Sequence, residues 1–328
     1  MLNGKSILIT GGTGSFGKNF VRRVLSLHNP RRMVIYSRDE FKQWQMAEEF
    51  KEYSSILRFF IGDVRDETRL ERALNGVDYV IHAAALKQVP ACEYNPSEAI
   101  KTNIVGAQNV IEASLNCNVK KVVALSTDKA VNPINLYGGT KLVSDKLFTA
   151  ANAYSGANGT TFSVVRYGNV AGSRGSVIPF FQAQIKNGKT SLPITDYRMT
   201  RFWISLDQGV ELVLKAIAEA KGGETFISKI PSFKITDLAQ AMLPGCQMEE
   251  IGIREGEKLH EVMVTKEDSF NTYEFENHFI IYPHMSWCDM NRYDLSGGKK
   301  VEFGFEYTSG TNTQWLSIDN IKCRLAQI

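Results

Sequence analysis

Short apolar runs alternate with stretches of helical spacing through the first half of the chain. Each run is rich in aliphatic and β-branched residues, which indicates a buried strand. The predicted strands are residues 6–10, 32–36, 57–61, 77–82, 121–125 and 161–166. The segments between them, most clearly 96–116 and 140–153, place apolar residues three and four positions apart, as helices do. This alternation predicts an α/β fold: a doubly wound parallel sheet with helices on both faces.

The pattern becomes mixed after residue 168. Helices are expected at residues 180–186, 207–220 and 236–242, whereas the C-terminal segment shows no clear periodicity. We therefore expect a larger domain over residues 1–168 and a smaller α/β part over residues 169–328. Whether segments of the later chain return to the first domain is left open.

A glycine-rich turn joins the first predicted strand to a helical stripe. Its glycines fit both G-x-G-x-x-G and G-x-x-G-x-x-G. Such a turn lets the backbone approach a pyrophosphate, which the N–H groups and dipole of a helix N-terminus stabilise. Glycines alone would indicate only a turn, but a strand before and a helix after predict a Rossmann-type dinucleotide site. The residues assigned to it are Gly11, Thr13, Gly14, Ser15, Phe16 and Gly17.

Polar residues follow the second predicted strand, where the adenosine ribose of a dinucleotide would lie. Ser37 and Arg38 at the strand tip favour a 2′-phosphate, because a guanidinium binds it through charge-assisted hydrogen bonds. This favours NADP over NAD. In the alternative, Arg38 is a surface charge and Asp39 accepts the ribose hydroxyl. The residues assigned to this end of the site are Ser37, Arg38, Asp39, Glu40 and Lys42.

Further residues at the ends of the third and fourth strands would face the same crevice. Asp63 is placed to bond the adenine amine, or else to cap the next helix. Small residues after the fourth strand let a dinucleotide pass close to the backbone. Lys87 would contact a phosphate or sugar, or be solvated, and His82 is interpreted as a core histidine. The assigned residues are Asp63, Val64, Ala83, Ala85 and Lys87.

The densest group of chemically active residues follows the fifth predicted strand. Thr127, Asp128 and Lys129 lie at the strand end. Tyr137 and Lys141, four positions apart, face the same way at the start of the next helix. In an open α/β sheet this edge is where ligands bind. A Tyr-x-x-x-Lys pair is common by chance and a loop Asp or Lys is commonly solvated, so the assignment depends on the glycine turn upstream.

The amino-acid composition mainly excludes some classes of protein. The 328 residues carry a formal net charge of +3 and no long basic run, so nothing favours nucleic-acid binding. No apolar stretch reaches the ~18 residues of a membrane span, and residues 1–10 form a strand pattern rather than a signal peptide. The five cysteines are scattered and outside metal-ligand spacing. We therefore expect a reduced cytoplasmic protein without disulfides or a metal.

Together these motifs resemble a known family. The glycine turn and the Tyr137–Lys141 pair are similar to those of extended short-chain dehydrogenases/reductases. Within that superfamily the chain resembles, over nearly its whole length, the configuration-inverting UDP-N-acetylglucosamine 4,6-dehydratases. The segments that carry this closer resemblance are residues 37–40, 82–87, 126–130, 166–170, 199–202 and 256–261. It is closest to the members that begin pseudaminic acid biosynthesis for flagellin or surface glycans. Retaining dehydratases have Glu at the position of Lys129, and a capsule-pathway branch has Met at that of Tyr137.

The resemblance implies an internal redox cycle with tightly bound, recycled NADP: oxidation at C4, loss of water across C5–C6, and return of the hydride to C6. Tyr137 would take the C4 hydroxyl proton, with Lys141 stabilising the phenolate, and Thr127 would bond the C4 oxygen. Lys129 would remove the C5 proton, which requires a lowered pKa, and Asp128 would protonate the leaving C6 hydroxyl, which requires a raised one. Reprotonation of C5 from the opposite face would give UDP-2-acetamido-2,6-dideoxy-β-L-arabino-hexos-4-ulose.

The resemblance also implies a UDP-N-acetylglucosamine site and a symmetric homo-oligomer, often a hexamer in the family. Arg254 is expected to bind the UDP phosphates, since a guanidinium forms bidentate hydrogen bonds with phosphate oxygens. The substrate-binding residues carried over are Lys87, Asn169, Thr195, Met199, Arg254, Glu257 and Asn312.

Other functions stay open. A UDP-hexose 4-epimerase or a retaining sugar-nucleotide dehydratase would use the same fold, although Lys129 speaks against both. A non-catalytic NADP-sensing protein belongs to a different class. Such proteins typically lose the Tyr/Lys pair, which this chain keeps as Tyr137 and Lys141.

Overall fold

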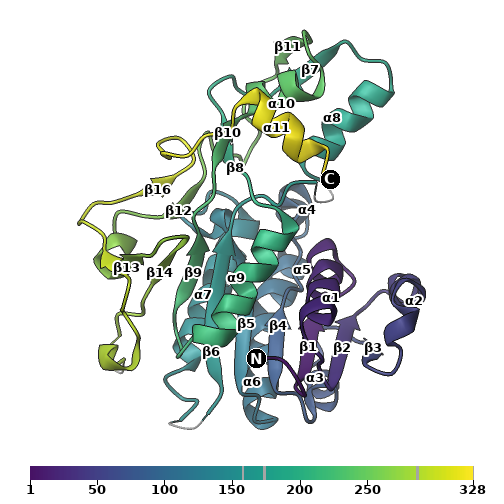
Figure 1. Ribbon diagram of the computed structural model, residues 1–328, viewed down its shortest axis with the longest axis vertical. Coiled ribbons are helices and arrows are strands. Elements are labelled where there is room, and N and C mark those ends of the chain that lie inside the picture. Colours follow the sequence, from purple (N-terminus) through teal and green to yellow (C-terminus); the bar gives the residue numbers. More distant parts are fainter. Residues whose placement is uncertain (157–158, 173–174, 286–287, 328) are drawn as a thin grey trace.

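The computed structural model describes residues 1–156, 159–172, 175–285 and 288–327. Within them, the centre of the molecule is a ten-stranded sheet in the order β15-β13-β14-β9-β6-β5-β4-β1-β2-β3 (Figure 1). Its parallel strands are β1 (Ser6–Thr10), β2 (Arg32–Ser37), β3 (Leu57–Ile61), β4 (Tyr79–His82), β5 (Lys121–Thr127), β6 (Thr161–Tyr167) and β9 (Thr225–Ser228). Its antiparallel strands are β14 (His278–Ile281), β13 (Thr272–Glu274) and β15 (Lys299–Lys300).

The predicted doubly wound parallel sheet is confirmed. The order β3-β2-β1-β4-β5-β6 is the one used by dinucleotide-binding folds. The order in which strands are added reverses between β1 and β4, although these two strands are parallel. All five residues of β1 are buried, because helices cover both faces of a parallel sheet. The four strands beyond β6 come from the later half of the chain, so that half also contributes to the main sheet.

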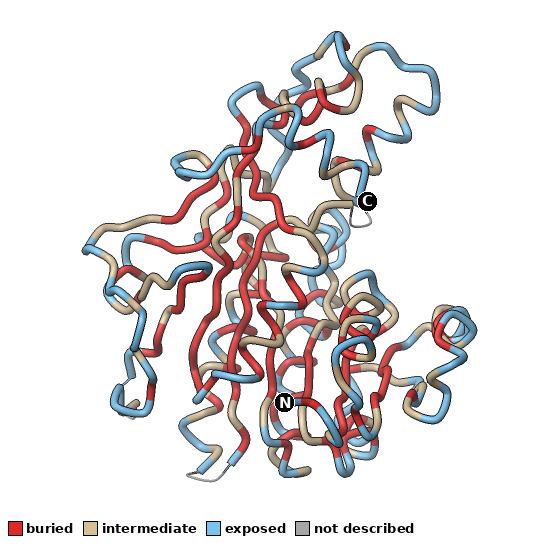
Figure 2. Tube along the Cα trace, viewed as in Figure 1, coloured by how far each residue is buried: buried red, intermediate tan, exposed pale blue. Residues whose placement is uncertain are grey.

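Two helical layers enclose the sheet. Helix α1 packs beside α9 on one face, whereas α3, α6 and α7 pack together on the other. Apolar side chains fill both interfaces, and Figure 2 shows the strands between them as buried. These helices are α1 (Ser15–Leu27), α3 (Glu67–Leu74), α6 (Gly106–Asn116), α7 (Leu136–Ala151) and α9 (Leu206–Glu219). The other helices of this part are α2 (Glu40–Glu49), α4 (Val89–Tyr94) and α5 (Pro96–Ile100).

The helix predicted at 96–116 is interrupted. A π-helical turn, Lys101–Val105, separates α5 from α6. It turns Asn103 into the interior, where the side chain bonds both backbone groups of Leu86 and the Thr140 hydroxyl at 2.8–3.0 Å. Apolar periodicity could not reveal this turn, because the buried residue at its centre is polar. Such turns occur at functional sites, and Thr102 of this one lines the cavity described below.

A smaller part sits beyond the carboxyl edge of the sheet, at the top of Figure 1. It has its own apolar core, to which Phe181, Trp203 and Leu238 belong. Its helices are α8 (Val177–Lys186), α10 (Ile235–Met242) and α11 (Ile318–Leu325). Its paired strands are β7 (Ser191–Ile194) with β11 (Gln247–Glu250) and β8 (Thr200–Phe202) with β10 (Ser232–Lys234); β12 (Val262–Val264) pairs with β16 (Tyr307–Thr308) beside the main sheet. No helix in the described part of the chain has the length and apolar character needed to cross a membrane.

Candidate active site

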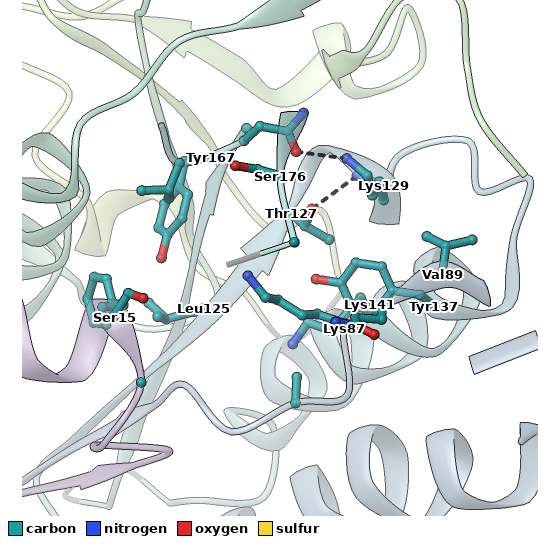
Figure 3. A pocket seen from close by; sticks show the side chains of 18 of the residues that line it. Ser15, Lys87, Val89, Leu125, Thr127, Lys129, Tyr137, Lys141, Tyr167 and Ser176 are labelled. Carbon is teal, nitrogen blue, oxygen red and sulfur yellow. Dashed lines mark hydrogen bonds between the residues drawn. The ribbon is translucent and has the colours of Figure 1, made fainter. Parts of the chain in front are cut away.

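A cavity of about 1250 Å³ lies at the carboxyl ends of the parallel strands, between the sheet and the smaller part. Its wall takes residues from the ends of β1, β2, β4, β5 and β6, from α8, and from the segment 251–261. Figure 3 shows the end of this cavity where the side chains of Thr127, Lys129 and Tyr137 gather. This is the edge at which the sequence predicts the site.

The glycine turn forms one end of the cavity. Gly11 has a φ of +65°, and a Cβ atom there would lie 2.9 Å from the backbone nitrogen of Ala84. Only glycine therefore lets β1 turn this close to the end of β4. Gly14 caps α1 and brings no side-chain hydrogen bond, so the N–H groups of the first turn remain for a ligand. All six residues assigned to the turn line the cavity, and the cradle fits a phosphate-bearing group.

His82 is a core histidine, as predicted. It is buried, and its Nδ1 lies 2.9 Å from the hydroxyl of Thr10. Burial, together with the positive charge of Lys141, lowers the pKa of His82 to about 3. His82 is therefore neutral at physiological pH and ties β4 to β1 behind the cavity.

Two basic side chains line the cavity wall near the tip of β2: Arg38 directly follows the strand, and Lys42 lies in the first turn of α2. The Arg38 guanidinium is half exposed and lies 3.6 Å from the Asp63 carboxylate. Asp39 caps α2: its carboxylate accepts the Lys42 N–H at 2.9 Å and lies 2.6 Å from the Lys42 ammonium. Asp39 lines the cavity with its carboxylate already bonded, whereas Glu40 is exposed and lies outside the wall.

Asp63 faces the same end of the cavity. The alternative that it caps the next helix is wrong, because Asp66 caps α3 by accepting the N–H of Arg69 at 2.9 Å. Asp63 instead bonds the Arg65 guanidinium at 2.7 Å. The other predicted residues at this end that line the cavity are Ser37, Val64, Ala83 and Ala85.

The segment from β5 to α7 is held in a tight fold. Thr127 begins a 3₁₀ turn, Asp128–Ala130, and Asn135 caps α7 by accepting the N–H of Gly138 at 2.8 Å. A Cβ atom on Gly138 would lie 2.1 Å from the carbonyl oxygen of Lys129. Glycine at this position therefore lets the first turn of α7 lie directly on the 3₁₀ turn. Both sets of predicted catalytic residues are brought to one place by this contact.

Tyr137 and Lys141 project from the first turns of α7 and are almost fully buried, yet both line the cavity. Burial raises the pKa of Tyr137 to about 12, and the opposing positive charge is that of Lys129. Burial lowers the pKa of Lys141, and the carboxylate of Asp145 opposes the shift. In this structure Lys129 therefore favours the phenolate of Tyr137, a role that the sequence had assigned to Lys141.

The Lys129 ammonium has three polar partners in the site. Its ammonium lies 3.1 Å from the Asn169 amide oxygen, 3.2 Å from Asp128 Oδ1 and 3.3 Å from Glu261 Oε1. Burial lowers the pKa of Lys129, but the two carboxylates outweigh burial and raise it. The expectation of a lowered pKa is therefore wrong for this geometry. A lowered pKa would have required burial or a neighbouring cation to dominate, but the charges of Asp128 and Glu261 together have the larger effect.

Asp128 is fully buried behind the cavity wall. Its Oδ1 accepts the Thr127 hydroxyl at 2.9 Å and the Lys129 ammonium at 3.2 Å, and burial followed by the charge of Glu261 raises the pKa of its carboxyl. The direction of this shift is the expected one. A proton on Asp128 reaches the cavity through the two groups that Asp128 bonds, both of which line it.

Glu261 and Arg201 are site residues that the sequence did not predict. Both line the cavity although both are buried, and the Arg201 Nε lies 3.5 Å from Glu261 Oε1. Each belongs to a segment that carried the family resemblance, which was the available signal. Their role was hidden because Glu261 meets Lys129 across 132 positions of sequence.

Most predicted substrate residues reach the cavity wall. The six that line it are Lys87, Asn169, Thr195, Met199, Arg254 and Glu257. The Arg254 guanidinium is largely exposed and lies 3.3 Å from Glu257. Asn312 lies outside the wall: its side-chain amide donates to the Ile230 carbonyl at 2.8 Å and to the Ser232 hydroxyl at 3.0 Å. The structure thus gives Asn312 a packing role in the smaller part.

The doubly wound sheet, the glycine turn and the Tyr137–Lys141 pair at its edge define an enzyme of the short-chain dehydrogenase/reductase class. Residues 7–283 match the family described as polysaccharide biosynthesis protein. The inverting UDP-N-acetylglucosamine 4,6-dehydratase of Campylobacter jejuni is 57% identical over 97% of this chain and 96% of its own. The UDP-glucose 4-epimerase of Rickettsia prowazekii is 44% identical over 97% and 94%.

Among solved structures, Pen from Bacillus thuringiensis superposes with a TM-score of 0.90 at 39% identity, over 100% of this chain and 98% of that one. The chain therefore belongs to the polysaccharide biosynthesis protein family and, within it, to the inverting UDP-N-acetylglucosamine 4,6-dehydratases, which are hydro-lyases.

Proposed function

We propose that this protein converts UDP-N-acetylglucosamine to UDP-2-acetamido-2,6-dideoxy-β-L-arabino-hexos-4-ulose by inverting 4,6-dehydration with C5 epimerisation. The observation that carries the proposal is Lys129, an amine in the cavity wall beside Thr127 and Tyr137 (Figure 3). An elimination needs such a base next to the Tyr/Lys pair of a dehydrogenase. The identity with the Campylobacter relative supports the same substrate.

NADP, retained and recycled, is the cofactor of this proposal. The glycine turn at the N-terminus of α1 suits its pyrophosphate, and Arg38 with Lys42 suits a 2′-phosphate at the tip of β2. Asp39 supports the same choice, because its carboxylate is committed to α2 and to Lys42 rather than open to a ribose hydroxyl. When bound, the nicotinamide supplies hydride acceptance at C4 and hydride return at C6.

The diphosphate and sugar of the substrate would occupy the other end of the cavity, toward the smaller part. Arg254 is the exposed cation there, so it would bind the phosphate oxygens. Lys87 lines the cavity nearer the sheet, and burial together with the charge of Lys129 lowers its pKa. Asn169 offers an amide to sugar hydroxyls beside Lys129.

The chain supplies the proton transfers of the reaction. Tyr137 takes the proton of the C4 hydroxyl, and Thr127 bonds the C4 oxygen. Lys129 removes the C5 proton, which the neighbouring C4 ketone acidifies. Asp128 provides the proton for the leaving C6 oxygen, and Lys141 holds a positive charge behind Tyr137. The direction of the pKa shift on Asp128 supports its role as an acid.

The test is incubation of the purified protein with UDP-N-acetylglucosamine in D₂O, without added reductant, followed by NMR of the sugar. The expected product has a C6 methyl group, a C4 ketone or its hydrate, deuterium at C5 and the L-arabino configuration. A product with deuterium at C5 but the original configuration would instead identify a retaining dehydratase. Unchanged UDP-N-acetylglucosamine would contradict the proposed function.

A UDP-hexose 4-epimerase is the second candidate, and the 44% identity with the Rickettsia relative favours it. An epimerase needs the Tyr/Lys pair and a bound dinucleotide but no base at C5. Lys129 and its two carboxylates would then have no chemical role. The same NMR experiment separates the two, because an epimerase gives the C4 epimer with neither a C6 methyl group nor deuterium at C5.

We place the reaction first in pseudaminic acid biosynthesis for flagellin or surface glycans, in the cytoplasm, and carried out by a homo-oligomer. Support for the pathway comes from Tyr137, which the resemblance associates with the pseudaminic-type members. Support for a reducing compartment comes from the five free cysteines, and the homo-oligomer rests on the family resemblance. Equilibrium sedimentation of the purified protein would test the homo-oligomer, and loss of the surface glycan in cells that lack the protein would test the pathway.

A further inference from the structure

Glu261 is a buried carboxylate that the proposed mechanism leaves unused. It lies just before β12 and is 2% exposed, but it contributes to the cavity wall. Its backbone is fixed by Ser309 on both sides: the Ser309 hydroxyl accepts the Glu261 N–H at 2.9 Å, and the Ser309 N–H donates to the Glu261 carbonyl at 2.8 Å. The carboxylate is thus held against Lys129 by a rigid backbone.

Four charges share this buried space. Asp128 and Glu261 each lie within 3.3 Å of the Lys129 ammonium, and Arg201 lies 3.5 Å from Glu261. Two carboxylates therefore face one ammonium and one guanidinium. Buried charges are tolerated only when they are paired, so the proton carried by Lys129 and Asp128 decides whether the group is neutral.

Glu261 acts on both members of the Lys129–Asp128 pair in the same sense. Its negative charge attracts the proton on Lys129 and opposes the negative charge on Asp128. If the pair lost its proton to solvent, two carboxylates would be left beside a neutral amine, with Arg201 as their nearest cation. Glu261 therefore opposes loss of the proton from the pair to solvent, while the proton, which rests on Lys129, can still move within the pair to Asp128.

We propose that Glu261, paired with Arg201, is a positioning residue that keeps one shared proton on Lys129 and Asp128 throughout the neutral pH range. Its use in catalysis depends on the proposed function. Transfer of that proton over the 3.2 Å contact breaks an N–H bond of Lys129, forms an O–H bond on Asp128, and creates the neutral base and acid that elimination needs.

The elimination then restores the starting charges. Lys129 takes the proton from C5, the electron pair of that bond forms the C5–C6 double bond, and the C6 oxygen leaves as water with the proton of Asp128. Lys129 is then an ammonium and Asp128 a carboxylate, as in the resting structure. No proton is exchanged with solvent in this half of the cycle.

The cluster consists of Asp128, Lys129, Arg201 and Glu261. The other titratable or charged groups that face it are Lys87, Tyr137, Glu257 and Lys258.

The test measures the proton on Lys129 without requiring turnover. The full-length protein, without substrate, is treated briefly with acetic anhydride at pH 8, and acetylation of Lys129 is quantified by mass spectrometry relative to exposed Lys146. Only the neutral amine reacts. Removal of a carboxylate this close lowers a lysine pKa by roughly 1–3 units, so Glu261→Gln should acetylate Lys129 at least about tenfold faster than the wild type.

Two variants separate charge from structure. Glu261→Asp keeps the charge and should return the rate toward that of the wild type. Glu257→Gln removes the other carboxylate on Arg201, which is not in contact with Lys129, and should leave the Lys129 rate unchanged. Equal rates in Glu261→Gln and wild type, or equal acceleration in Glu261→Gln and Glu257→Gln, would overturn the proposal.

Turnover provides the link to function. For Glu261→Gln we expect kcat to fall more than KM rises, and the alkaline limb of the kcat profile to move to lower pH, because the pair now loses its proton more easily. If the pH profile of kcat were the same in Glu261→Gln and the wild type, the proposed role of Glu261 in catalysis would be overturned. If the wild type forms no keto-deoxy sugar, the proposed function fails, whereas the acetylation rates still decide the role of Glu261.

Discussion

The carbonyl oxygen of Lys129 lies against Gly138, so closely that a Cβ atom on Gly138 would approach it to 2.1 Å. This contact brings together the chain at Lys129, the base of the proposed elimination, and at Tyr137, because Lys129 is one partner of the contact and Tyr137 directly precedes the other. One backbone contact between a 3₁₀ turn and a helix thus positions both the Tyr137–Lys141 pair and the Asp128–Lys129 pair.

Gly138→Ala should therefore damage the site through the backbone. The added methyl group must push α7 away from the 3₁₀ turn, and overpacking of this kind costs about 1–3 kcal/mol of folding stability. We expect a lower thermal unfolding midpoint and a larger loss in kcat. Gly139→Ala is the matched control: its Cβ would meet nothing within 4 Å, so the change should stabilise the helix by about 0.5–1 kcal/mol and spare activity. Equal behaviour of the two variants would contradict this account.

Lys129→Ala should separate the two halves of the proposed reaction. Loss of a general base slows the dependent step by roughly 10²–10⁴-fold, so deuterium incorporation at C5 should be abolished on the assay timescale. Oxidation at C4 depends on Tyr137 and should remain measurable as a single-turnover absorbance change of the bound nicotinamide. Lys146→Ala, at an exposed position of α7, is the control. Normal turnover by Lys129→Ala would rule out the proposed scheme.

Arg38→Ala tests the choice of cofactor. A hydrogen bond to a charged group contributes about 1.5–3 kcal/mol, so affinity for NADP should fall roughly 10–100-fold while affinity for NAD changes little. Arg65→Ala removes another guanidinium that pairs with Asp63 but does not line the cavity, and it should affect both cofactors alike. Isothermal titration with each dinucleotide measures the effect. Equal losses for NADP and NAD in Arg38→Ala would argue against a 2′-phosphate site.

His82 should make the fold sensitive to acid. Its pKa is about 3 in the folded protein and 6.5 as an ordinary histidine, so the unfolded chain binds more protons between these values. The stability associated with neutral His82 is complete above pH 6.5 and is lost as the pH falls toward 3, by about 3 kcal/mol at pH 4. Denaturant unfolding at pH 7 and pH 4 should show a smaller loss in His82→Asn than in the wild type. Identical losses would mean that another group controls the acid transition.

The parts of the fold and site that the sequence predicted are local in the chain. The apolar runs of β1, β2, β4, β5 and β6 are largely buried, so each carries its own signal. The edge strand β3 is only partly buried, but its residues are still mostly apolar. The glycine turn and the Tyr137–Lys141 spacing each lie within a single turn or helix. Physical rules about short segments were sufficient for these features.

The features that were missed depend on long-range contacts or on very short elements. Glu261 acquires its role only through its contact with Lys129, 132 positions away, and the same contact reverses the expected pKa shift of Lys129. The edge strands β13 to β15 have two to four residues each, too few for a periodic pattern. Asn312 has the residue type of a sugar ligand, and only the structure shows its amide bonded to Ile230.

Arg254 and Asn312 therefore form an informative pair for mutation. Arg254 is largely exposed, so Arg254→Ala should change folding stability by less than about 0.5 kcal/mol but should raise KM for the UDP-sugar, because a phosphate contact is lost. Asn312→Ala removes the donor to the Ser232 hydroxyl and one of the two donors to the Ile230 carbonyl, which the Tyr307 hydroxyl still bonds at 2.9 Å. The loss of these two hydrogen bonds should cost about 1–3 kcal/mol of stability at nearly constant KM. Thermal unfolding and steady-state kinetics on both variants measure the contrast. If Asn312→Ala raised KM without loss of stability, Asn312 would be a substrate ligand after all, and the smaller part would have to close on the cavity during turnover.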